Sequence, residues 1–361
     1  MQLVRDKKKI LLISPLPPPA GGIATWTEKI LNVGLSDKYE IVLVNTQIIG
    51  SRKNFENSKL TIHEINRNVA ILFELILMIT KKKPALVHLN SSLAPNGILR
   101  DAFISIIIKI FKIPLISHYR GNVVDFPKKL NRGLNYKILR FLFSMSNRNI
   151  VLNLLSKKHC NSEFNSKNTL IIPNFIEDTI LSNKAHFKNK KLKVIYVGAI
   201  IKAKGIEDII TLASEHKNID FECVGDIVDK ELYNKYDNLI FTGSLERADV
   251  IRKLCESSIF IFPSHSEGFP NAVLEAMAVG LPIIGSNAGA IPEMVDDGLG
   301  GYVFEGKNLK ECKKAFNNII YDKEKLMVMG NYNRNKVVNN YTHKKVVGQL
   351  CKLYDEAISD F

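Results

Sequence analysis

Apolar and polar positions along the chain follow two alternating periods. Short, almost uninterrupted apolar runs, typical of buried strands, are separated by longer segments whose apolar residues recur at helical spacing. In the first half, the predicted strands are 9–14, 41–45, 86–90, 115–118 and 149–152. The helices predicted between them are 25–35, 98–111 and 136–146. This β-α-β alternation predicts a parallel sheet covered on both faces by helices.

The same rhythm restarts after a polar stretch at residues 183–193. The strands predicted there are 193–197, 221–224, 239–242, 259–263 and 282–286. The predicted helices are 205–215 and 271–278, and the last 60 residues are mostly helical. We therefore expect an α/β chain with two Rossmann-like domains, 1–180 and 190–340, and a C-terminal helix at 341–361 that returns to the first domain.

Composition narrows the class of protein. The 361 residues are 46% hydrophobic and 24% charged, which is ordinary for a globular chain with a core in each half. The longest apolar runs, 69–79 and 102–117, contain charges and fall short of the roughly 20 residues that a membrane-spanning helix needs. No secretory signal is apparent, and the five cysteines form no C-x-x-C pair. These features predict a reduced, cytoplasmic protein without a disulfide framework or a zinc site.

Charge is distributed unevenly along the chain. Residues 1–170 hold 26 Lys and Arg against 10 Asp and Glu, whereas the other 191 residues hold 24 against 26. The first half, at +16, therefore suggests an anionic partner, although a merely solvated lysine-rich face is also compatible. Basic and apolar residues interleave between residues 128 and 148, as in helices that lie on anionic membranes. Nucleic acid is disfavoured, because the aromatic residues form no stacking platform among the charges.

The loops after the strands hold the candidate chemistry. Ligands of open α/β sheets bind beyond the carboxyl ends of the strands, so two facing sheets would bind one in the cleft between them. Gly21 and Gly22, in the loop after the first strand, let backbone amides approach an anion. The loop lacks the G-x-G-x-x-G and Walker A spacings, which argues against an NAD-dependent oxidoreductase. A plain loop that needs positive φ is equally compatible.

A second loop, 197–205, opens the second half. Gly198 there permits close approach of a ligand, and Lys202 and Lys204 stand near the start of a helix. Cations are unfavourable at a helix N-terminus unless a phosphate lies there, so the loop indicates a phosphate site. Two solvated lysines are the alternative interpretation.

The third loop, 263–270, carries the strongest pattern. Pro270 suits the first turn of the following helix and Gly280 suits its end. Glu267 precedes this helix, and Glu275 lies within it. Two carboxylates around one helix start, directly after a strand, indicate binding of sugar or ribose hydroxyl groups.

Two further loops belong to the predicted cleft. A glycine loop at 286–293 enters a helix after a strand and would line the same pocket. In the first half, His118 and Arg120 follow the fourth strand. Arg120 is suited to an anionic substrate, whereas His118 either faces the cleft or, like most lone histidines, is structural.

Glu267 and Glu275, with seven residues between them, resemble the E-x7-E signature of retaining glycosyltransferases of family 4, which have the GT-B fold. The segments at 21–22, 173–174, 198–205 and 289–293 resemble the same family in their order and spacing along most of the chain. The resemblance implies a transferase with two Rossmann-like domains facing across a cleft.

The resemblance also implies roles for individual residues. Glu267 would bind hydroxyl groups of the donor sugar, and Glu275 the ribose hydroxyl groups of the nucleotide. The backbone amides that would approach the sugar and the diphosphate are those of Gly268, Phe269, Asn271 and Ala272.

Five further residues gain a role from the resemblance. Lys204, with the Gly21–Gly22 loop, would stabilise the diphosphate leaving group, and His118 would lie near the transferred sugar. Leu245 would contact the nucleotide base.

The chain departs from the family pattern at two positions. Ala199 stands where an arginine is usual, so the leaving group would rely on Lys204, with or without Lys202. Loss of one such donor typically costs about 2.7–4 kcal/mol of transition-state stabilisation, which puts full activity or the usual donor in question. Phe175 stands where a glycine is common, and we expect it to alter packing rather than chemistry.

The implied reaction is transfer of a sugar from a nucleotide-sugar, a UDP-sugar, to an acceptor hydroxyl with retention and without a metal ion. The basic first half fits an anionic lipid-linked or polysaccharide acceptor, in surface polysaccharide or glycolipid assembly at the inner face of the cytoplasmic membrane. Two alternatives remain open. One is a nucleotide-sugar 2-epimerase-like isomerase that uses His118 and Glu267, and the other is a non-catalytic nucleotide-sugar-binding protein, which Ala199 makes conceivable.

Overall fold

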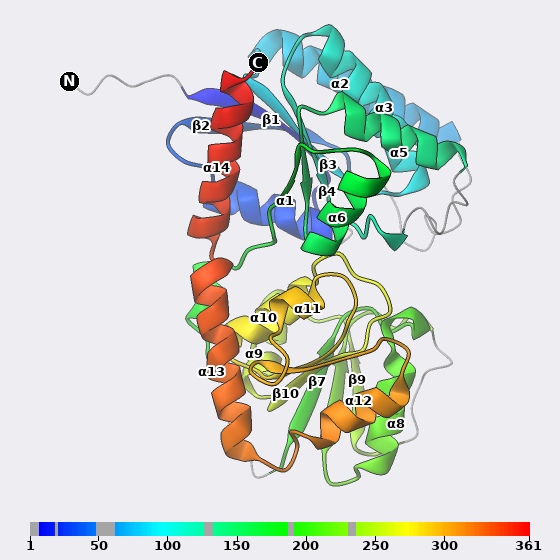
Figure 1. The fold of residues 1–361 in the computed structure, drawn as a ribbon, viewed down its shortest axis with the longest axis vertical. Helices are drawn as coiled ribbons and strands as arrows, with labels where there is room; N and C mark the ends of the chain where they lie inside the picture. Colours follow the sequence, from blue (N-terminus) through cyan, green and yellow to red (C-terminus); the bar gives the residue numbers. More distant parts are fainter. Residues whose placement is uncertain (1–6, 19–20, 48–61, 126–132, 187–190, 230–235) are drawn as a thin grey trace, which may run out of the picture. The chain divides into compact units, whose positions relative to one another are not determined.

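The computed structural model describes residues 7–18, 21–47, 62–125, 133–186, 191–229 and 236–361 (Figure 1). The chain folds into two compact units. Met1–Asn174 and Lys344–Phe361 form the first unit, and Phe175–His343 forms the second. The C-terminal helix thus belongs to the first unit, and the second unit includes Phe175, upstream of the position 190 expected from the sequence pattern.

The first unit is built on a six-stranded parallel sheet in the order β2-β1-β3-β4-β5-β6. Its strands are β1 (Lys8–Ser14), β2 (Tyr39–Asn45), β3 (Leu86–Ser91), β4 (Leu115–Tyr119), β5 (Arg148–Val151) and β6 (Thr169–Ile171). The residues from Ile10 to Ser14 are all buried, because helices cover both faces of the sheet. β1 and β3 are neighbours, and the chain leaves them in opposite directions, which makes their carboxyl ends the switch point of this sheet.

Helices of the first unit cover the two faces of its sheet. They are α1 (Gly22–Val33), α2 (Ile62–Lys82), α3 (Pro95–Ile110), α5 (Leu134–Met145), α6 (Leu154–Glu163) and α14 (His343–Ser359). α2, α3 and α5 lie on one face, and α1 and α14 on the other (Figure 1). Crossovers between parallel strands are right-handed, so the direction of a connection along the sheet decides which face its helix covers. The β1 to β2 connection, which contains α1, runs toward one edge of the sheet, and the later connections run toward the other edge. α1 therefore lies on the opposite face from α2, α3 and α5.

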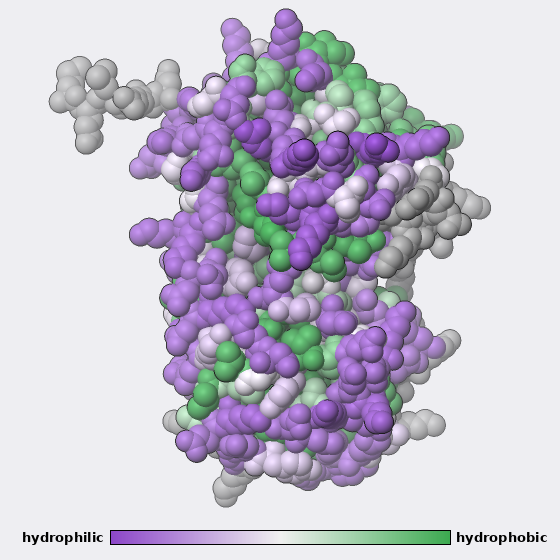
Figure 2. Space-filling model, viewed as in Figure 1, coloured by the Kyte–Doolittle hydropathy of each residue, from purple (hydrophilic) through white to green (hydrophobic). Residues whose placement is uncertain are grey.

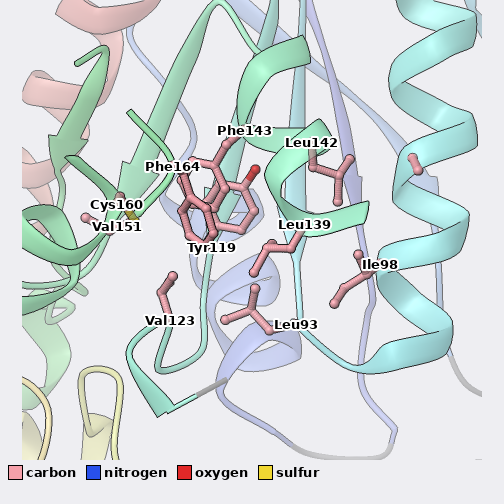
Figure 3. Packing of buried hydrophobic residues seen from close by; sticks show 11 residues of the cluster. Leu93, Ile98, Tyr119, Val123, Leu139, Leu142, Phe143, Val151, Cys160 and Phe164 are labelled. Carbon is pink, nitrogen blue, oxygen red and sulfur yellow. The ribbon is translucent and has the colours of Figure 1, made fainter. Parts of the chain in front are cut away.

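Two apolar clusters form the core under α2, α3, α5 and α6. One joins α2 and α3 to β1, β2 and β3 through residues such as Leu75, Ile104 and Leu11. The other lies beneath α5 and α6, where the rings of Tyr119 and Phe143 stack with centroids 4.1 Å apart (Figure 3). Stacked rings and branched aliphatic side chains fill this space at close contact, which fixes α5 on the sheet.

The second unit contains a second six-stranded parallel sheet, in the order β12-β11-β10-β7-β8-β9. Its strands are β7 (Lys193–Val197), β8 (Asp220–Val224), β9 (Leu239–Gly243), β10 (Ile259–Phe262), β11 (Ile283–Ser286) and β12 (Gly301–Phe304). β7 and β10 are neighbours from which the chain runs to opposite sides. Their carboxyl ends are therefore the switch point of this sheet, where ligands of such folds bind.

The helices of the second unit connect these strands. They are α7 (Asp178–Leu181), the 3-10 turn Lys202–Lys204, α8 (Ile206–Glu215), α9 (Arg247–Cys255), α10 (Asn271–Val279), α11 (Ile291–Met294), α12 (Leu309–Asn317) and α13 (Lys323–Asn340). α10 begins directly after Pro270 and ends at Gly280, whose φ is +89°. The bounds agree with the predicted helix 271–278, and Gly280 forms the left-handed cap as expected of glycine. Pro270, however, is the extended N-cap before the helix and does not lie in its first turn.

The pattern also left elements unpredicted, namely α2, α6, α7, α9, β6 and β12. Within the described residues, no helix combines the length and the apolarity that crossing a bilayer requires. All five cysteines are buried and unbonded.

Candidate active site

An ion pair lies at the switch point of the second unit. The Nζ atom of Lys204, in the loop after β7, donates to Oε1 of Glu267, in the loop after β10, over 2.5 Å. The hydroxyl of Ser264 donates to the same carboxylate oxygen over 2.7 Å. Adjacent parallel strands thus bring together residues that lie 63 positions apart in the sequence.

Glycines let the three loops of this site pack closely. A Cβ on Gly205, whose φ is +71°, would lie 2.2 Å from the carbonyl oxygen of Pro263. A Cβ on Gly289, whose φ is +56°, would lie 2.0 Å from the carbonyl oxygen of Glu267. Both contacts are far inside van der Waals distance, so only glycine fits. The loops after β7, β10 and β11 therefore form one packed layer around the ion pair.

Gly198 has a packing role in this layer. A Cβ there would lie 2.6 Å from the hydroxyl of Tyr196, and a Cβ on Gly225 would lie 2.0 Å from the carbonyl oxygen of Gly198. The Tyr196 hydroxyl donates to the carbonyl oxygen of Ala199 over 3.0 Å. Burial, followed by the nearby charge of Glu267, raises the pKa of Tyr196 well above its ordinary value, so this phenol stays neutral.

Lys202 lies apart from the Lys204–Glu267 pair. Its side chain is 55% exposed, and its ammonium lies 3.9 Å from the carboxylate of Glu207. Its backbone amide donates to the carboxylate of Asp229. The two lysines of the predicted phosphate loop therefore point to different partners, and Lys204 is the one that meets an acidic residue of the predicted pair.

Glu275 faces a cation that the sequence pattern did not reveal. Its carboxylate lies 3.8 Å from the guanidinium of Arg247, the first residue of α9, which also pairs with Glu177. The Glu275 side chain is largely buried. Arg247 therefore balances two carboxylates at the edge of the site.

The remaining predicted donor residues follow β9 and β10. Gly268, Asn271 and Ala272 are half-buried, and Phe269 is buried against the ring of Tyr341, with centroids 5.6 Å apart. The carbonyl oxygen of Gly268 accepts from the amide of Ala290 over 3.0 Å. The last of these residues, in the loop between β9 and α9, is the half-buried Leu245.

The first unit holds a chain of buried polar side chains. The Nδ1 atom of His88 lies 2.5 Å from the hydroxyl of Tyr354 on α14, and its Nε2 atom lies 3.3 Å from Nδ1 of His118. The Nε2 atom of His118 lies 3.0 Å from Nη1 of Arg120, whose Nη2 donates to Asn174 over 2.6 Å. His118 is therefore buried with both ring nitrogens engaged.

The arginine sets the direction of every bond in this chain. Arg120 only donates, so His118 accepts at Nε2 and carries its proton on Nδ1. His88 then accepts at Nε2 and donates from Nδ1 to the oxygen of Tyr354. Burial, followed by the charge of Arg120, lowers the pKa of His88 to about 3 and that of His118 well below its ordinary value. Both histidines are neutral at physiological pH.

Arg120 and the glycine loop complete the predicted residues of this unit. The Arg120 guanidinium is buried, lies 4.6 Å from the ring centroid of Trp26 and has a pKa lowered to about 9 by burial. Gly21 is extended at φ −176°, and Gly22 begins α1 with open space where a Cβ would stand. The alternative of a loop that needs positive φ is thus wrong for Gly21.

Residues 177–336 match the family model of glycosyl transferases group 1. The second unit carries a glycosyl transferases group 1 domain. The transferase is 23% identical over 335 residues to the capsular polysaccharide biosynthesis glycosyltransferase CapM of Staphylococcus aureus, covering 85% of this chain and 88% of that protein. It is also 24% identical over 292 residues to the sulfoquinovosyl transferase SQD2 of Arabidopsis thaliana, covering 73% and 55%.

Solved structures match this transferase across both units. Sucrose-phosphate synthase from Thermosynechococcus elongatus matches with a TM-score of 0.80 at 15% identity, covering 98% of this chain and 100% of that one. HepE of Anabaena, solved with UDP and glucose, matches with a TM-score of 0.72 at 16% identity, covering 97% and 100%. These matches confirm the predicted GT-B fold class.

Sequence reasoning missed three side chains of this site. Ser264 donates to Glu267, Ser286 donates to the carbonyl oxygen of Ser264, and Arg247 faces Glu275. A hydroxyl three residues before Glu267 and directly after a strand is a weak signal for the first. Nothing in the local pattern marks Arg247, because its partners Glu177 and Glu275 come from elements distant in the sequence.

Proposed function

We propose that this transferase moves a sugar from a UDP-sugar to a hydroxyl of a lipid-linked or polysaccharide acceptor, with retention at the anomeric carbon. The observation that carries the proposal is the Lys204–Glu267 pair at the switch point of the group 1 domain. Binding of UDP and of UDP-glucose by HepE, which shares the fold, supports the choice of donor. The named relative CapM supports an acceptor in surface polysaccharide assembly.

Lys204 is proposed to neutralise the departing diphosphate. An ammonium has three N–H donors, and Glu267 takes one of them, which leaves two for phosphate oxygens. The preceding Ala199 supplies no charge, so Lys204 carries this role. Lys202 contributes at longer range, since its ammonium is directed to Glu207. With the backbone amides at the start of α10, this charge acts without a metal ion in our proposal.

Glu267 is proposed to orient the donor sugar rather than to attack it. Its contacts with Lys204 and Ser264 both fall on Oε1, which leaves Oε2 without a donor among the described residues. A carboxylate held by an ammonium and a hydroxyl is a weak nucleophile, but its second oxygen accepts a sugar hydroxyl well. Retention then follows from front-face displacement, with no covalent sugar–enzyme intermediate.

Glu275 is proposed to bind the ribose hydroxyl groups. Its largely buried carboxylate lies 3.8 Å from the guanidinium of Arg247, which is beyond the distance of a direct hydrogen bond. The amides of Gly268, Phe269, Asn271 and Ala272 are proposed to approach the sugar and diphosphate. Leu245 is proposed to contact the base.

The first unit is proposed to bind the acceptor, because its charge matches an anionic lipid-linked sugar. The uncapped start of α1 at Gly22 offers backbone amides to an anionic group. His118 and Arg120 are buried, so we propose that they position the surrounding loops rather than contact substrate. We place the reaction at the inner face of the cytoplasmic membrane.

Incubation with UDP-sugars and lipid-linked or polysaccharide acceptors tests the proposal. We expect transfer with retained anomeric configuration, measured by NMR of the product, and an unchanged rate in EDTA. Epimerised donor without transfer would support the isomerase instead.

A thermal-shift panel of UDP, GDP and ADP tests the donor site separately. UDP should raise Tm most, and Glu275→Ala should abolish that rise because the ribose loses its acceptor. Glu256→Ala is the matched control, since Glu256 forms a surface ion pair with Arg252 in the same unit. A full UDP shift in Glu275→Ala would contradict the ribose role.

A further inference from the structure

Helix α2 has two apolar stripes rather than one. Ile71, Leu75 and Ile79 pack into the core. On the opposite side, exposed apolar side chains recur at spacings of three and four residues, at Ile62, Ile65, Val69, Phe73 and Ile76. Such spacing places them in one row along the helix, about 21 Å long. A surface helix of a soluble protein needs only the core stripe, so the second row requires another explanation.

Helix α3, which packs beside α2, has the same feature. Ile98, Ile104 and Ile108 are buried, whereas an exposed row runs through Leu99, Phe103, Ile106 and Ile110. Leu134 and Phe141 on α5 add two more exposed apolar side chains. Half of the large apolar side chains that are exposed in the described part of the chain lie on α2, α3 and α5 or directly after them. Figure 2 shows apolar side chains gathered where Figure 1 draws α2 and α3.

Cations flank this apolar face, and two of the three acidic residues of α2 and α3 are buried in ion pairs. Exposed lysines close α2 and α3, at Lys81, Lys82, Lys83, Lys109 and Lys112. Among the described residues, none of these five takes part in an ion pair. Of the acidic residues on the two helices, Glu64 pairs with Arg67 and Asp101 with Arg100, which leaves Glu74.

A basic hollow lies beside α5. Its volume is about 770 Å³. Its walls include Lys137, Arg140 and Lys167 together with Phe141 and Phe164, and no acidic residue lines it. Cations and aromatic rings in one lining suit a phosphate on an apolar chain.

We propose that α2, α3 and α5 form a docking face for an anionic lipid bilayer. The exposed rows enter the boundary between head groups and acyl chains, and the lysines reach the lipid phosphates from their flexible stems. A second protein chain fits less well, because lysine is depleted at protein–protein interfaces. The inference deepens the proposed function, since a lipid-linked acceptor is met at a membrane. It adds α2 and α3 to the interleaved basic segment 128–148, which contains α5 and of which residues 128–132 lie outside the described residues.

Vesicle sedimentation tests the face without any need for activity. The full chain should pellet with phosphatidylcholine vesicles that contain phosphatidylglycerol and remain in the supernatant with phosphatidylcholine alone. Phe73→Ser with Ile110→Ser should weaken binding at least about tenfold, because both side chains are 71% exposed and support no core. Lys81, Lys82 and Lys83 changed together to Gln should weaken binding to anionic vesicles at least about tenfold.

Tyr321→Ser with Val328→Ser is the matched control, because these side chains are similarly exposed, at 78% and 62%, but belong to the second unit. It should bind vesicles as the parent does. Failure of the parent chain to pellet, or undiminished binding of the Phe73 and Ile110 variant, would overturn the proposal. A dimer that this variant converts to a monomer in light scattering, with vesicle binding unchanged, would assign the face to a second copy. UDP thermal shifts on the same proteins report separately on the proposed function, since they need no membrane.

Discussion

The polar side chains of β3 and β4 in the first unit and those of the loops after β7 and β10 in the second carry opposite kinds of chemistry. In the first unit the polar side chains are buried, the histidines are neutral, and each hydrogen bond is matched to the next. In the second unit an ammonium meets a carboxylate at half-exposed loops. A buried neutral chain fixes structure, whereas an accessible ion pair retains donors and acceptors for a ligand.

The same difference appears on the outer surfaces. Excess positive charge and a second apolar row belong to the helices of the first unit, whereas the second unit is nearly neutral by sequence. Related sheet architectures therefore serve different partners, because surface side chains vary without disturbing the core. We propose that one unit meets the acceptor and its membrane and the other holds the donor.

Replacing Lys204 should produce the largest effect. Lys204→Ala should lower kcat about 100- to 1000-fold, because the departing diphosphate loses its cation. The rate of transfer at saturating donor measures this. Lys313→Ala is the control, since Lys313 forms a surface ion pair with Glu215 in the same unit. A kcat within a factor of a few of the parent would remove Lys204 from the chemistry.

A methyl group at Gly289 should have the next largest effect. Gly289→Ala should cost about 3 kcal/mol in the free energy of unfolding of the second unit, because the Cβ collides with the Glu267 carbonyl at a positive φ. UDP binding should weaken with it, since the Glu267 loop must move. Urea titration and thermal shift measure the two effects. In contrast, Gly348→Ala, an exposed helical site with open space around it, should stabilise by up to about 1 kcal/mol.

Acid should act on the first unit through its buried histidines. The folded-state pKa of His88 is about 3 and its unfolded value about 6.5, so the unfolded chain takes up protons first as pH falls. Stability contributed by the neutral ring is complete above pH 6.5 and declines below it, by about 2 kcal/mol at pH 5 for His88. His118 shifts in the same direction.

Trp26 allows this loss to be assigned to the first unit. It is the sole tryptophan of the sequence, and its ring centroid lies 5.6 Å from those of both His88 and His118. Urea unfolding followed by its fluorescence should show the decline between pH 7 and 5. His63→Gln, at an exposed position on α2, should leave the decline unchanged. Equal unfolding free energies at pH 7 and pH 5 would show that folding does not lower the pKa values of His88 and His118.

The hydroxyl of Ser264 should have the smallest effect. Ser264→Ala removes one of the two hydrogen bonds to Oε1 of Glu267, which is worth about 1 kcal/mol, so kcat should fall about fivefold with little change in KM for the donor. Ser257→Ala is the control, because Ser257 donates to the carbonyl oxygen of Lys253 away from the site. A rise in KM that exceeds the fall in kcat would indicate that Ser264 supports packing of the loop and does not position Glu267.

The sequence predicted the fold well and the site in part. Continuous apolar runs identified ten of the strands. Strands that are buried on both faces are apolar at nearly every position, so they stand out as uninterrupted runs in the sequence. The strands β6 and β12 escaped because they are short, with three and four residues. α2 was missed because its two apolar stripes blur the single helical period.

Residue chemistry in the loops, together with the resemblance that it supports, marked Lys204, Glu267 and Glu275 from the amino-acid sequence alone. The sequence also determined the excess positive charge of the first half, since composition does not depend on folding. Tertiary structure alone decided that Lys204 rather than Lys202 meets Glu267, that Arg247 faces Glu275, and that His118 is enclosed between His88 and Arg120. Each of these pairings joins residues from different strands or helices, or depends on which way a side chain points from its loop. Local spacing cannot fix such contacts, because strand order and loop packing set them.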